Sequence, residues 1–517
     1  MAKLFDLALH PRITGTEQLY YCKNADGFSF DTYFNGIPIR KLRQYTTIQG
    51  LQFSQRAEFR TEQGFLKTDD SIDLSEIPED VQRLYVKTAE MPIELTVDAI
   101  GETRSMYPAI IICTYHRVWQ VKDNIDYILM HLQDISYRII LVDNASEIPI
   151  DTWDDERITV LHHINNGGSG GFAFGMQYAA QQGIFTHLLL MDDDVTVDFV
   201  ALQRLFGFLQ LLKEEYADMC IAGSMLYADE PTIQFECGGY FGPDGIQTGY
   251  GYRYDLTQQD NLLCNEHDNL INYGGWWMFC MPIRYAAEGA YPAPFFVKYD
   301  DVEYALRCKL KIVTLGGVGV WHESFGSKYN SVQEYFNTRN YLFLRKWHTP
   351  DFTDKAAYKT ARYLLLEKLC RQQYKMAEAV LMAYEDFLKG DAYLERINYE
   401  EKLSELRKLN YTMLTEEEIY SQYGIRFDVK LYRKCSGRQF KRYMQPLLYG
   451  HLIPGLFCRR LTITDVLADR KEHYLGANTV LHINQSDRAG YVTKKSIITF
   501  IRFMVRLRMI KKVFLKT

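Results

Sequence analysis

The chain has 517 residues, of which 47% are hydrophobic and 24% charged, as in ordinary globular proteins. Its net charge of −6 argues against a general nucleic-acid binder, so we expect no nucleic-acid partner. No apolar run reaches the ~18 residues of a membrane span, and the first residues lack the apolar stretch of a secretory signal. The 10 cysteines form no CxxC pair, which indicates free thiols in a reducing cytoplasm.

Residues 1 to 100 are rich in strand-forming residues separated by turn signals. Asp26-Gly27 and Asn35-Gly36 are tight-turn dipeptides between aromatic, β-prone runs. The alternating pattern continues through residues 46–65. This segment is predicted to form a small β-sandwich.

Residues 101 to 348 show short apolar strands that alternate with segments of helical length. Residues 109–115 and 138–144 are two of these strands, and both end in polar residues. Such alternation predicts an α/β domain with a mostly parallel sheet, in which ligands bind beyond the carboxyl ends of the strands.

Three consecutive aspartates, Asp192, Asp193 and Asp194, follow the apolar run of residues 188–191. Adjacent carboxylates raise each other's pKa unless a cation or several donors keep them ionised. Capping of a helix explains one or two of the three. The pattern is also that of a divalent-metal site at the end of a strand.

The segment NNGGSGGF, residues 165–172, stands between a predicted strand and a predicted helix. Glycine-rich turns let the backbone approach a phosphate at a helix N-terminus. The spacing does not fit GxGxxG after a first strand, and GxxxxGK[ST] is absent. A nucleotide other than NAD therefore fits this loop better than a dinucleotide or a P-loop ligand.

Three further features allow both a structural and a functional interpretation. Trp276 and Trp277 are either core residues or rings that stack on a sugar. Asp300 and Asp301 either cap a helix or include the general base that a hydroxyl nucleophile requires. His322 is either structural or a third metal ligand, because carboxylates with one imidazole suit Mn²⁺ or Mg²⁺.

Residues 349 to 517 are predicted to be largely helical, with Thr353 as a cap. The tail, residues 494–517, carries eight Lys or Arg and no acid. As a helix it gathers apolar residues on one side: Phe500, Phe503, Met504, Leu507, Ile510 and Phe514. Its other side carries cations: Arg502, Arg506, Lys512 and Lys516. The helix either packs on its own domain or lies in an anionic membrane interface.

The order of these motifs resembles that of the family 2 glycosyltransferases with a GT-A fold. The motifs, in chain order, are TYHR, LVDN, NNGGSGG, MDDD, GGWW, YDD and HES. The likeness is greatest to bacterial UDP-galactofuranose transferases that build cell-wall or surface galactan. Those enzymes also have an N-terminal β-sandwich and a helical C-terminal region, so the resemblance extends over most of the chain.

The resemblance implies a role for each matching residue. Asp192, Asp194 and His322 would hold Mn²⁺ or Mg²⁺ on the UDP diphosphate, and Asp301 would be the catalytic base. The remaining positions would bind the nucleotide sugar: Thr114, Arg117, Asp143, Asn144, Asn165 and Asp193. The sugar and acceptor pocket would include Trp276, Trp277 and Asp300. His116 replaces the family's usual asparagine.

The function implied is inverting, metal-dependent transfer of galactofuranose from UDP-galactofuranose to a hydroxyl of a growing, lipid-linked cell-surface glycan. The partners would be the UDP-sugar donor, a glycan or glycolipid acceptor and an anionic membrane surface, with homo-oligomerisation left open. A cytoplasmic protein, peripheral on the inner face of the membrane, is expected. The alternatives are a family 2 rhamnosyltransferase, a UDP-hexopyranose transferase and a non-catalytic carbohydrate-binding protein.

Overall fold

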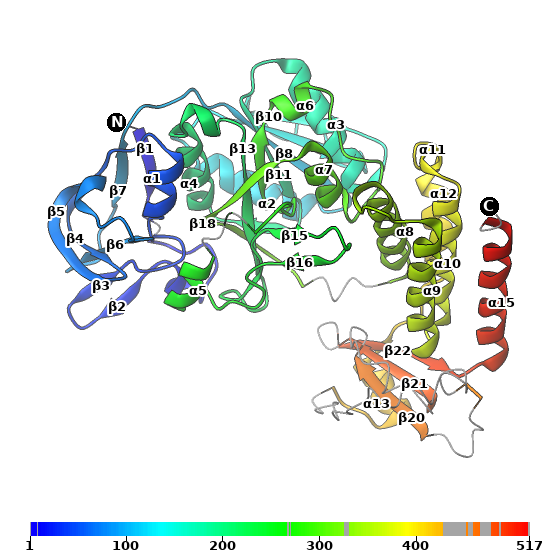
Figure 1. Ribbon diagram of the computed structural model, residues 1–517. Helices are drawn as coiled ribbons and strands as arrows, with labels where there is room; N and C mark the ends of the chain where they lie inside the picture. Colours follow the sequence, from blue (N-terminus) through cyan, green and yellow to red (C-terminus); the bar gives the residue numbers. More distant parts are fainter. Residues whose placement is uncertain are drawn as a thin grey trace. The chain divides into compact units, whose positions relative to one another are not determined.

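The computed structural model describes residues 2–7, 9–265, 268, 270–324, 330–427, 451–452, 459–465, 477–484 and 488–514. It contains two compact units, Met1–Glu323 and Ser324–Thr517 (Figure 1). The expected three-part division, with boundaries after residues 100 and 348, stays a prediction.

The N-terminal strands join in one seven-stranded antiparallel sheet of order β1-β7-β4-β6-β3-β2, with β5 paired to β4. The sandwich expected from the sequence is thus a single sheet, because the long strand β4 pairs with β7 through residues 50–53 and with β6 through residues 58–61. The elements are β1 (Ala2–Asp6), β2 (Cys22–Asn24), β3 (Gly27–Ser29), α1 (Ile39–Tyr45), β4 (Gly50–Thr61), β5 (Gly64–Asp73), β6 (Leu84–Thr88) and β7 (Thr96–Ile100).

A nine-stranded sheet of order β10-β9-β8-β11-β17-β13-β18-β12, with β14 paired to β13, follows in the same unit. Strands β10, β9, β8 and β11 are parallel, and β17 is antiparallel to both of its neighbours. The strands are β8 (Pro108–Thr114), β9 (Arg138–Asp143), β10 (Ile158–His162), β11 (His187–Asp192), β12 (Val195–Val197), β13 (Met219–Tyr227), β14 (Gln234–Glu236), β17 (Phe279–Pro282) and β18 (Lys311–His322). The predicted α/β class is confirmed. The sheet is mixed instead of mostly parallel, because β17, β12 and β14 pair antiparallel with their neighbours, while β10, β9, β8 and β11 form its parallel half.

Helices and a small hairpin complete this unit. Helix α4 packs against both β1 and β18, so it joins the N-terminal sheet to the large sheet (Figure 1). The helices are α2 (Val118–His131), α3 (Gly167–Gln182), α4 (Phe199–Gln210), α5 (Gln259–Cys264), α6 (Arg284–Ala287) and α7 (Asp300–Cys308). The hairpin is β15 (Gly239–Phe241) with β16 (Gln247–Gly249).

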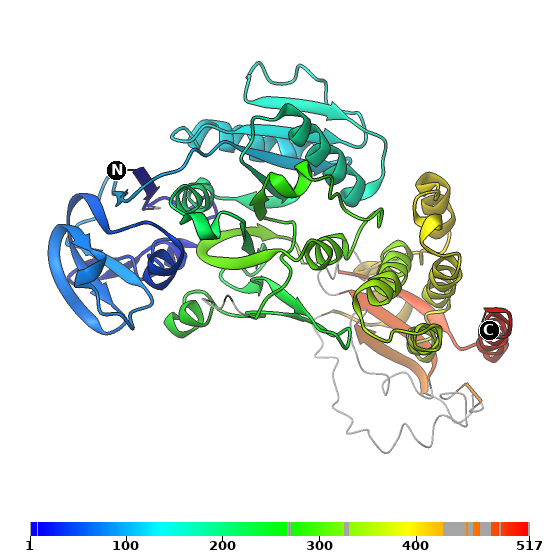
Figure 2. The ribbon, with the colours of Figure 1, turned by 45° about the horizontal axis from the view of Figure 1, so that its top comes forward.

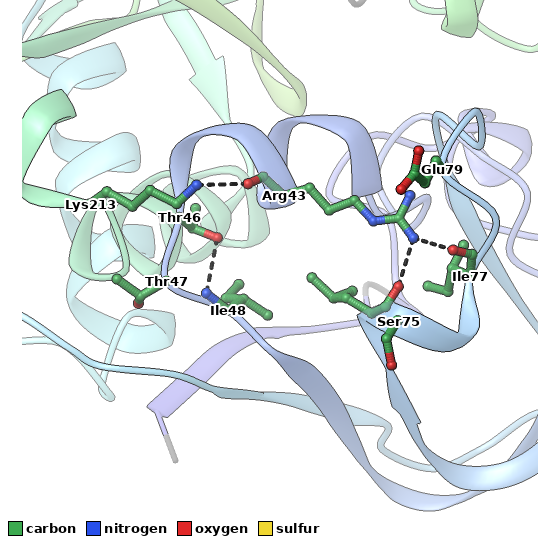
Figure 3. A pocket seen from close by; sticks show the side chains of 9 residues that line it. Arg43, Thr46, Thr47, Ile48, Ser75, Ile77, Glu79 and Lys213 are labelled. Carbon is green, nitrogen blue, oxygen red and sulfur yellow. Dashed lines mark hydrogen bonds between the residues drawn. The ribbon is translucent and has the colours of Figure 1, made fainter.

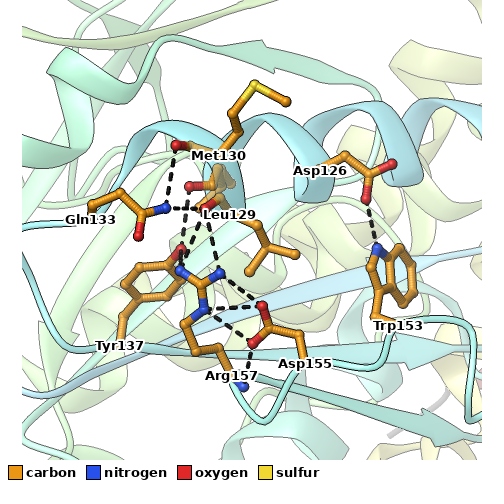
Figure 4. A network of polar contacts seen from close by, with 9 residues as sticks. Asp126, Leu129, Met130, Gln133, Tyr137, Trp153, Asp155 and Arg157 are labelled. Carbon is orange, nitrogen blue, oxygen red and sulfur yellow. Dashed lines mark hydrogen bonds and ion pairs between the residues drawn. The ribbon is translucent and has the colours of Figure 1, made fainter.

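A polar network fixes α2 against the segment that leads into β10. The Arg157 guanidinium pairs with Asp155 at 2.7 Å and also donates to the carbonyl of Leu129, near the end of α2 (Figure 4). The indole of Trp153 donates to Asp126 at 2.7 Å. These contacts fix the position of α2 relative to the edge strand β10.

The second unit contains a helical bundle and a four-stranded sheet of order β19-β22-β21-β20. Its helices are α8 (Ser331–His348), α9 (Asp354–Cys370), α10 (Tyr374–Leu388), α11 (Asp391–Leu394), α12 (Tyr399–Arg407), α13 (Glu416–Tyr423) and α15 (Ile497–Phe514). Its strands are β19 (Leu414–Thr415), β20 (Arg459–Asp465), β21 (Ala477–Asn484) and β22 (Ala489–Lys494). The helical C-terminal region is confirmed, with Thr353 capping α9 through the backbone N–H of Ala356. The sheet was not predicted.

Helix α15 corrects one expectation about the tail. The apolar face that the sequence offered to a membrane is turned into the bundle, because Phe500, Phe503, Leu507 and Ile510 are buried and the helix contacts α9 and α10. On α10, Glu378 and Glu385 bind the Arg506 guanidinium. The alternative of a helix packed on its own domain is therefore correct for this face. Lys516 lies outside the described residues.

Among the described residues, no helix is both long and apolar enough to cross a membrane.

Candidate functional site

Three strands of the large sheet end level with one another at its carboxyl edge. In the strand register Thr114 of β8 lies opposite Asp143 of β9, and Cys113 lies opposite Asp192 of β11. The predicted polar clusters are therefore neighbours in space, as expected for the carboxyl ends of parallel strands.

Asp192, Asp194 and His322 form a cluster whose candidate ligand atoms all lie within 4.8 Å of one another. The histidine is brought there by the pairing of β12 with β18, which sets His322 opposite Val195. Its Nε2 is 3.0 Å from Asp194 Oδ1, and its Nδ1 donates to the Glu323 carbonyl at 2.5 Å. Since a carbonyl only accepts, Nδ1 carries a proton and Nε2 faces the carboxylates, the orientation that metal-binding histidines adopt.

The aspartates are short of compensating charge. Burial, together with the charge of Asp194, raises the pKa of Asp192 to about 7 and that of Asp193 to about 6. The pKa of His322 is also raised: burial alone lowers it, but the hydrogen bond and charge of Asp194 outweigh that effect. The Arg117 guanidinium lies 2.7 Å from Asp194. Carboxylate oxygens and one imidazole nitrogen in an electronegative pocket fit Mn²⁺ or Mg²⁺.

Asp193, the middle aspartate, turns toward the end of β8. Its Oδ2 accepts from the Thr114 hydroxyl at 2.8 Å and from the Tyr115 backbone N–H at 3.3 Å. Asp193 is therefore held by β8, and its neighbours on either side belong to the cluster with His322. Asp192 ends β11 and the other two aspartates form the turn before β12, so the change of chain direction sets the carboxylates apart.

Polar side chains after β9 and β10 hold the glycine-rich loop in place. The carboxylate of Asp143 accepts three backbone N–H bonds, at 2.7–2.9 Å, from the turn that follows β9. Asn144 donates to the carbonyl of Gly167 at 3.0 Å, and Asn165 accepts from the Gly167 N–H at 3.1 Å. Their predicted contacts with a nucleotide stay predictions; the observed bonds shape the loop.

Helix α3 starts at this loop and lies very close to β8. Gly167 has φ +72°, and a Cβ there would lie 2.0 Å from the Phe296 carbonyl oxygen. A Cβ at Gly171 would lie 2.1 Å from Cys113 Sγ, and one at Gly175 would lie 2.6 Å from Ile111. The glycines thus bring the N-terminus of α3 up to the carboxyl edge of the sheet, where it favours an anion.

Trp276 and Trp277 are largely buried, with 5% and 8% of their surface exposed. The indole N–H of Trp277 donates to the Gly223 carbonyl at 2.9 Å, and Trp276 packs edge-on against Phe172 and Tyr304. Of the two alternatives, the core interpretation accounts for most of both rings, and the sugar contact stays a prediction for their small exposed part.

Asp300 and Asp301 open α7 behind a strained loop. Three residues of this loop, Phe296, Lys298 and Tyr299, have φ between 66° and 72°, a conformation that non-glycine residues rarely adopt. Burial raises the pKa of Asp301 to about 6, against the opposing effect of the Val302 N–H that it accepts at 2.8 Å. Burial and the charge of Asp301 raise the pKa of Asp300 to about 8. Asp301 thus has a pKa suited to a general base at neutral pH.

Glu236, the last residue of β14, is a buried carboxyl that the sequence analysis did not find. Burial and the charge of Asp301 raise its pKa to about 8, and the Tyr273 hydroxyl donates to it at 3.3 Å. Its only sequence signal was a single acid at the end of a short segment, Gln234–Glu236. The pairing of β14 with the preceding strand β13 is local in sequence, but the approach of Glu236 to Asp301 is not.

A separate open cavity of about 730 Å³ is lined by α1, by residues 46–48 and 74–79, and by Lys213, which follows α4. None of the residues described above lines it. Its two cations bind backbone carbonyls: Arg43 binds those of Leu74 and Ile77, and Lys213 binds that of Arg43 (Figure 3). The contacts of both cations are therefore structural, and they connect α1 to the segments on either side of the cavity.

Residues 109–279 match the family model described as Glycosyl transferase family 2. This range contains the aspartate triplet, the glycine-rich loop and the tryptophan pair. The chain therefore contains a family 2 glycosyltransferase domain, a domain of an enzyme family. Asp301 and His322 lie beyond the matched range.

Two curated relatives are the galactofuranosyltransferases GlfT2 of Mycobacterium tuberculosis and Mycolicibacterium smegmatis. The first is 26% identical over 257 residues, which are 46% of this chain and 40% of that protein. The second is 27% identical over 272 residues, which are 49% of this chain and 41% of that protein. The matches thus span about two fifths of the relatives' own length.

Two solved structures show weaker likeness. One is the mannosyltransferase PcManGT from Pyrobaculum calidifontis with GDP-Man and Mn²⁺, at 12% identity, a TM-score of 0.32 and coverage of 58% of this chain and 84% of that one. The other is S. aureus TarS 1–349 with UDP, at 11% identity, a TM-score of 0.32 and coverage of 54% and 81%. Likeness at this level carries no argument about this chain.

Proposed function

We propose that the chain transfers galactofuranose from UDP-galactofuranose to a hydroxyl of a growing, lipid-linked cell-surface glycan, with inversion and with a divalent cation. The observation that carries the reaction type is the cluster of Asp192, Asp194 and His322 at the carboxyl edge of a family 2 domain, with the half-buried base candidate Asp301 at the start of α7. The choice of donor is supported by the names of the two curated relatives.

We assign each residue of the site a role in a single nucleophilic displacement at the anomeric carbon. A divalent cation held by Asp192, Asp194 and His322 would supply the positive charge that a leaving diphosphate needs. Asp301 removes the proton of the acceptor hydroxyl, which attacks the anomeric carbon from the face opposite the diphosphate. Asp193 and Thr114 hold the end of β8 in place, and the N-terminus of α3 faces the donor's negative charge.

A panel of donors tests the choice of sugar. With Mn²⁺ and a galactofuranose-containing acceptor, we expect transfer from UDP-galactofuranose and little from UDP-galactopyranose, UDP-glucose or dTDP-rhamnose, measured by mass spectrometry of the product. EDTA-treated protein without added metal is the control. Transfer from dTDP-rhamnose alone would establish the rhamnosyltransferase alternative, and transfer from none of the donors would favour a carbohydrate-binding protein.

The rate is expected to depend on pH through Asp301. A base must be deprotonated to act, and burial raises the pKa of Asp301 to about 6, so kcat/KM should increase as the pH rises through 6 and then level off. The measurement is kcat/KM between pH 5 and 8 with Mn²⁺ kept saturating at each pH. A flat profile over that range would assign the base to another residue.

The proposal keeps a cytoplasmic location with peripheral attachment to an anionic membrane surface. The buried apolar face of α15 cannot serve for this attachment, because the helical bundle covers it. Another surface must therefore make the contact.

A further inference from the structure

Helix α1 of the N-terminal region binds a carboxylate of residues 265–273, the linking segment, which leads into the tryptophan pair. Lys41 and Tyr45 lie four residues apart on one side of α1. The Lys41 ammonium donates to Asp268 Oδ1 at 2.5 Å, and the Tyr45 hydroxyl donates to Asp268 Oδ2 at 2.9 Å. In both ribbon views α1, drawn in blue, lies between the N-terminal strands and the large sheet (Figures 1 and 2). Both oxygens of Asp268 are thus bound by α1.

This contact buries an ion pair. The Lys41 side chain has no exposed surface, and that of Asp268 is 8% exposed. The ammonium also donates to the hydroxyl and the carbonyl of Thr314, in β18, so each of its three protons has a partner. Burial and the charge of Asp268 raise the pKa of Tyr45, which keeps its hydroxyl protonated as a donor.

Stability alone does not account for such a pair. Two charges that leave water lose about as much as they gain from each other, so apolar side chains of similar size are often at least as stabilising. A buried pair does impose one geometry, because any displacement would leave a charge unpaired in the interior. The contact between α1 and Asp268 is therefore suited to fixing a position.

The linking segment is bonded on its other side to β14 and β15. Of its residues, the structure describes 265, 268 and 270–273. The side chains of Asn265 and Gln234 exchange two hydrogen bonds, at 2.6 and 3.0 Å. The side chain of Asn272 binds the backbone N–H and carbonyl of Phe241 at 2.8 and 3.0 Å. Asp268 therefore connects α1 to a segment that is itself fixed to these strands.

The end of the linking segment reaches the acceptor side of the site. Its last residue, Tyr273, donates from its hydroxyl to Glu236 at 3.3 Å. Burial and the charge of Asp301 raise the pKa of Glu236, so these two carboxyls are close enough to interact. Two glycines follow Tyr273 and lead to Trp276 and Trp277. A shift of the linking segment would therefore displace the partner of Glu236 and the start of the tryptophan pair.

We infer that Lys41 and Tyr45 are positioning residues, which hold the linking segment through Asp268 and so set the geometry of the acceptor side. The inference rests on the proposed function, because it requires an acceptor that binds beside Asp301. It gives the N-terminal region a part in the reaction. The proposed nucleotide side is built from β8, β9 and the start of α3, so loss of the contact should weaken use of the acceptor and spare the donor.

Lys41→Met/Tyr45→Phe/Asp268→Leu separates positioning from stability. It replaces all three polar partners by apolar side chains of similar size, so Tm should stay the same or rise. The KM for a galactofuranose-containing acceptor should nevertheless rise roughly tenfold at saturating UDP-galactofuranose and Mn²⁺. The affinity for UDP, measured by calorimetry, should not change. Tyr45→Phe alone keeps the ring against Tyr216 and should raise the acceptor KM roughly threefold, since it removes one hydrogen bond.

Arg43→Gln, on the same helix, is the matched control. Its guanidinium binds the carbonyls of Leu74 and Ile77, so its loss should lower Tm and leave the acceptor KM unchanged. Hydrogen–deuterium exchange of residues 270–281 provides a readout that needs no activity. Exchange should be faster in the triple variant than in the unchanged chain, and Arg43→Gln should match the unchanged chain.

The two measurements distinguish the possible failures. The inference is overturned if residues 270–281 exchange equally slowly in the triple variant, or if its acceptor KM stays normal. It is also overturned if Arg43→Gln raises the acceptor KM as much, because general loosening of α1 would then explain the effect. If the unchanged chain transfers no sugar, the proposed function fails, and exchange alone decides whether α1 holds the linking segment.

Discussion

Asp194→Ala is expected to reduce metal-dependent transfer by roughly 10³-fold or more while leaving the protein folded. The Asp194 carboxylate contacts both His322, at 3.0 Å, and Arg117, at 2.7 Å. Its loss therefore removes one candidate metal ligand and the partner of both side chains. The fold should persist because the change also removes one charge from a crowded set of carboxylates. Activity with saturating Mn²⁺ is the first measurement.

A second measurement separates binding of the cation from catalysis. A cation that binds only the folded state stabilises it by about 2.7 kcal/mol at 100 times its Kd, so Mn²⁺ should raise the Tm of the unchanged chain and not that of Asp194→Ala. His322→Ala should behave in the same way. Asp151→Ala, at an exposed position of the same domain, is the control and should keep both properties. Normal activity of Asp194→Ala in Mn²⁺ would disprove the metal assignment.

Asp301→Asn is expected to lower kcat by roughly 10² to 10⁴, the usual contribution of a general base, with little change in donor binding. The amide has the same shape and its oxygen can still accept the Val302 N–H, so α7 keeps its first turn. An amide cannot take a proton from the acceptor, however. Steady-state kinetics give kcat, and calorimetry gives the affinity for UDP.

The same substitution at another helix start provides the control. Asp260→Asn lies in the exposed first turn of α5 and should leave kcat unchanged. The pH profile gives a further check, because the rise of kcat/KM near pH 6 should disappear in Asp301→Asn. If donor affinity falls and kcat stays near normal, Asp301 binds substrate and another group is the base.

The gathering of polar residues at one edge of the sheet could be predicted because it follows from local rules. Apolar strands alternating with helices give parallel pairing, and parallel pairing sets Thr114, Asp143 and Asp192 level at their carboxyl ends. Glu236 could not be found this way. It reaches Asp301 through the pairing of β14 with β13 and through the fold of the chain between residues 236 and 301, which no short motif records.

Helix α15 shows a different limit of sequence reasoning. The amphipathic pattern identified the side that is buried, but it could not decide whether that side packs on the protein or lies in a membrane. The choice is made by α10, whose Glu378 and Glu385 bind Arg506 and so fix the rotation of α15. The sheet of β19 to β22 was missed in part because β19 pairs Leu414 with Gly490, far along the chain, whereas β21 and β22 are consecutive strands.

The tight contact between α3 and β8 limits how this enzyme can diverge. At Gly171 and Gly175 even one added methyl group would overlap Cys113 or Ile111, and at Gly167 it would overlap the Phe296 carbonyl. At ordinary core positions a larger side chain can be compensated by a smaller one next to it. Glycine has the smallest side chain, so these positions cannot change in that way. Under the proposed function, new substrate preferences would therefore arise from exchanges at other positions, because α3 and β8 leave no space for a side chain at these three glycines.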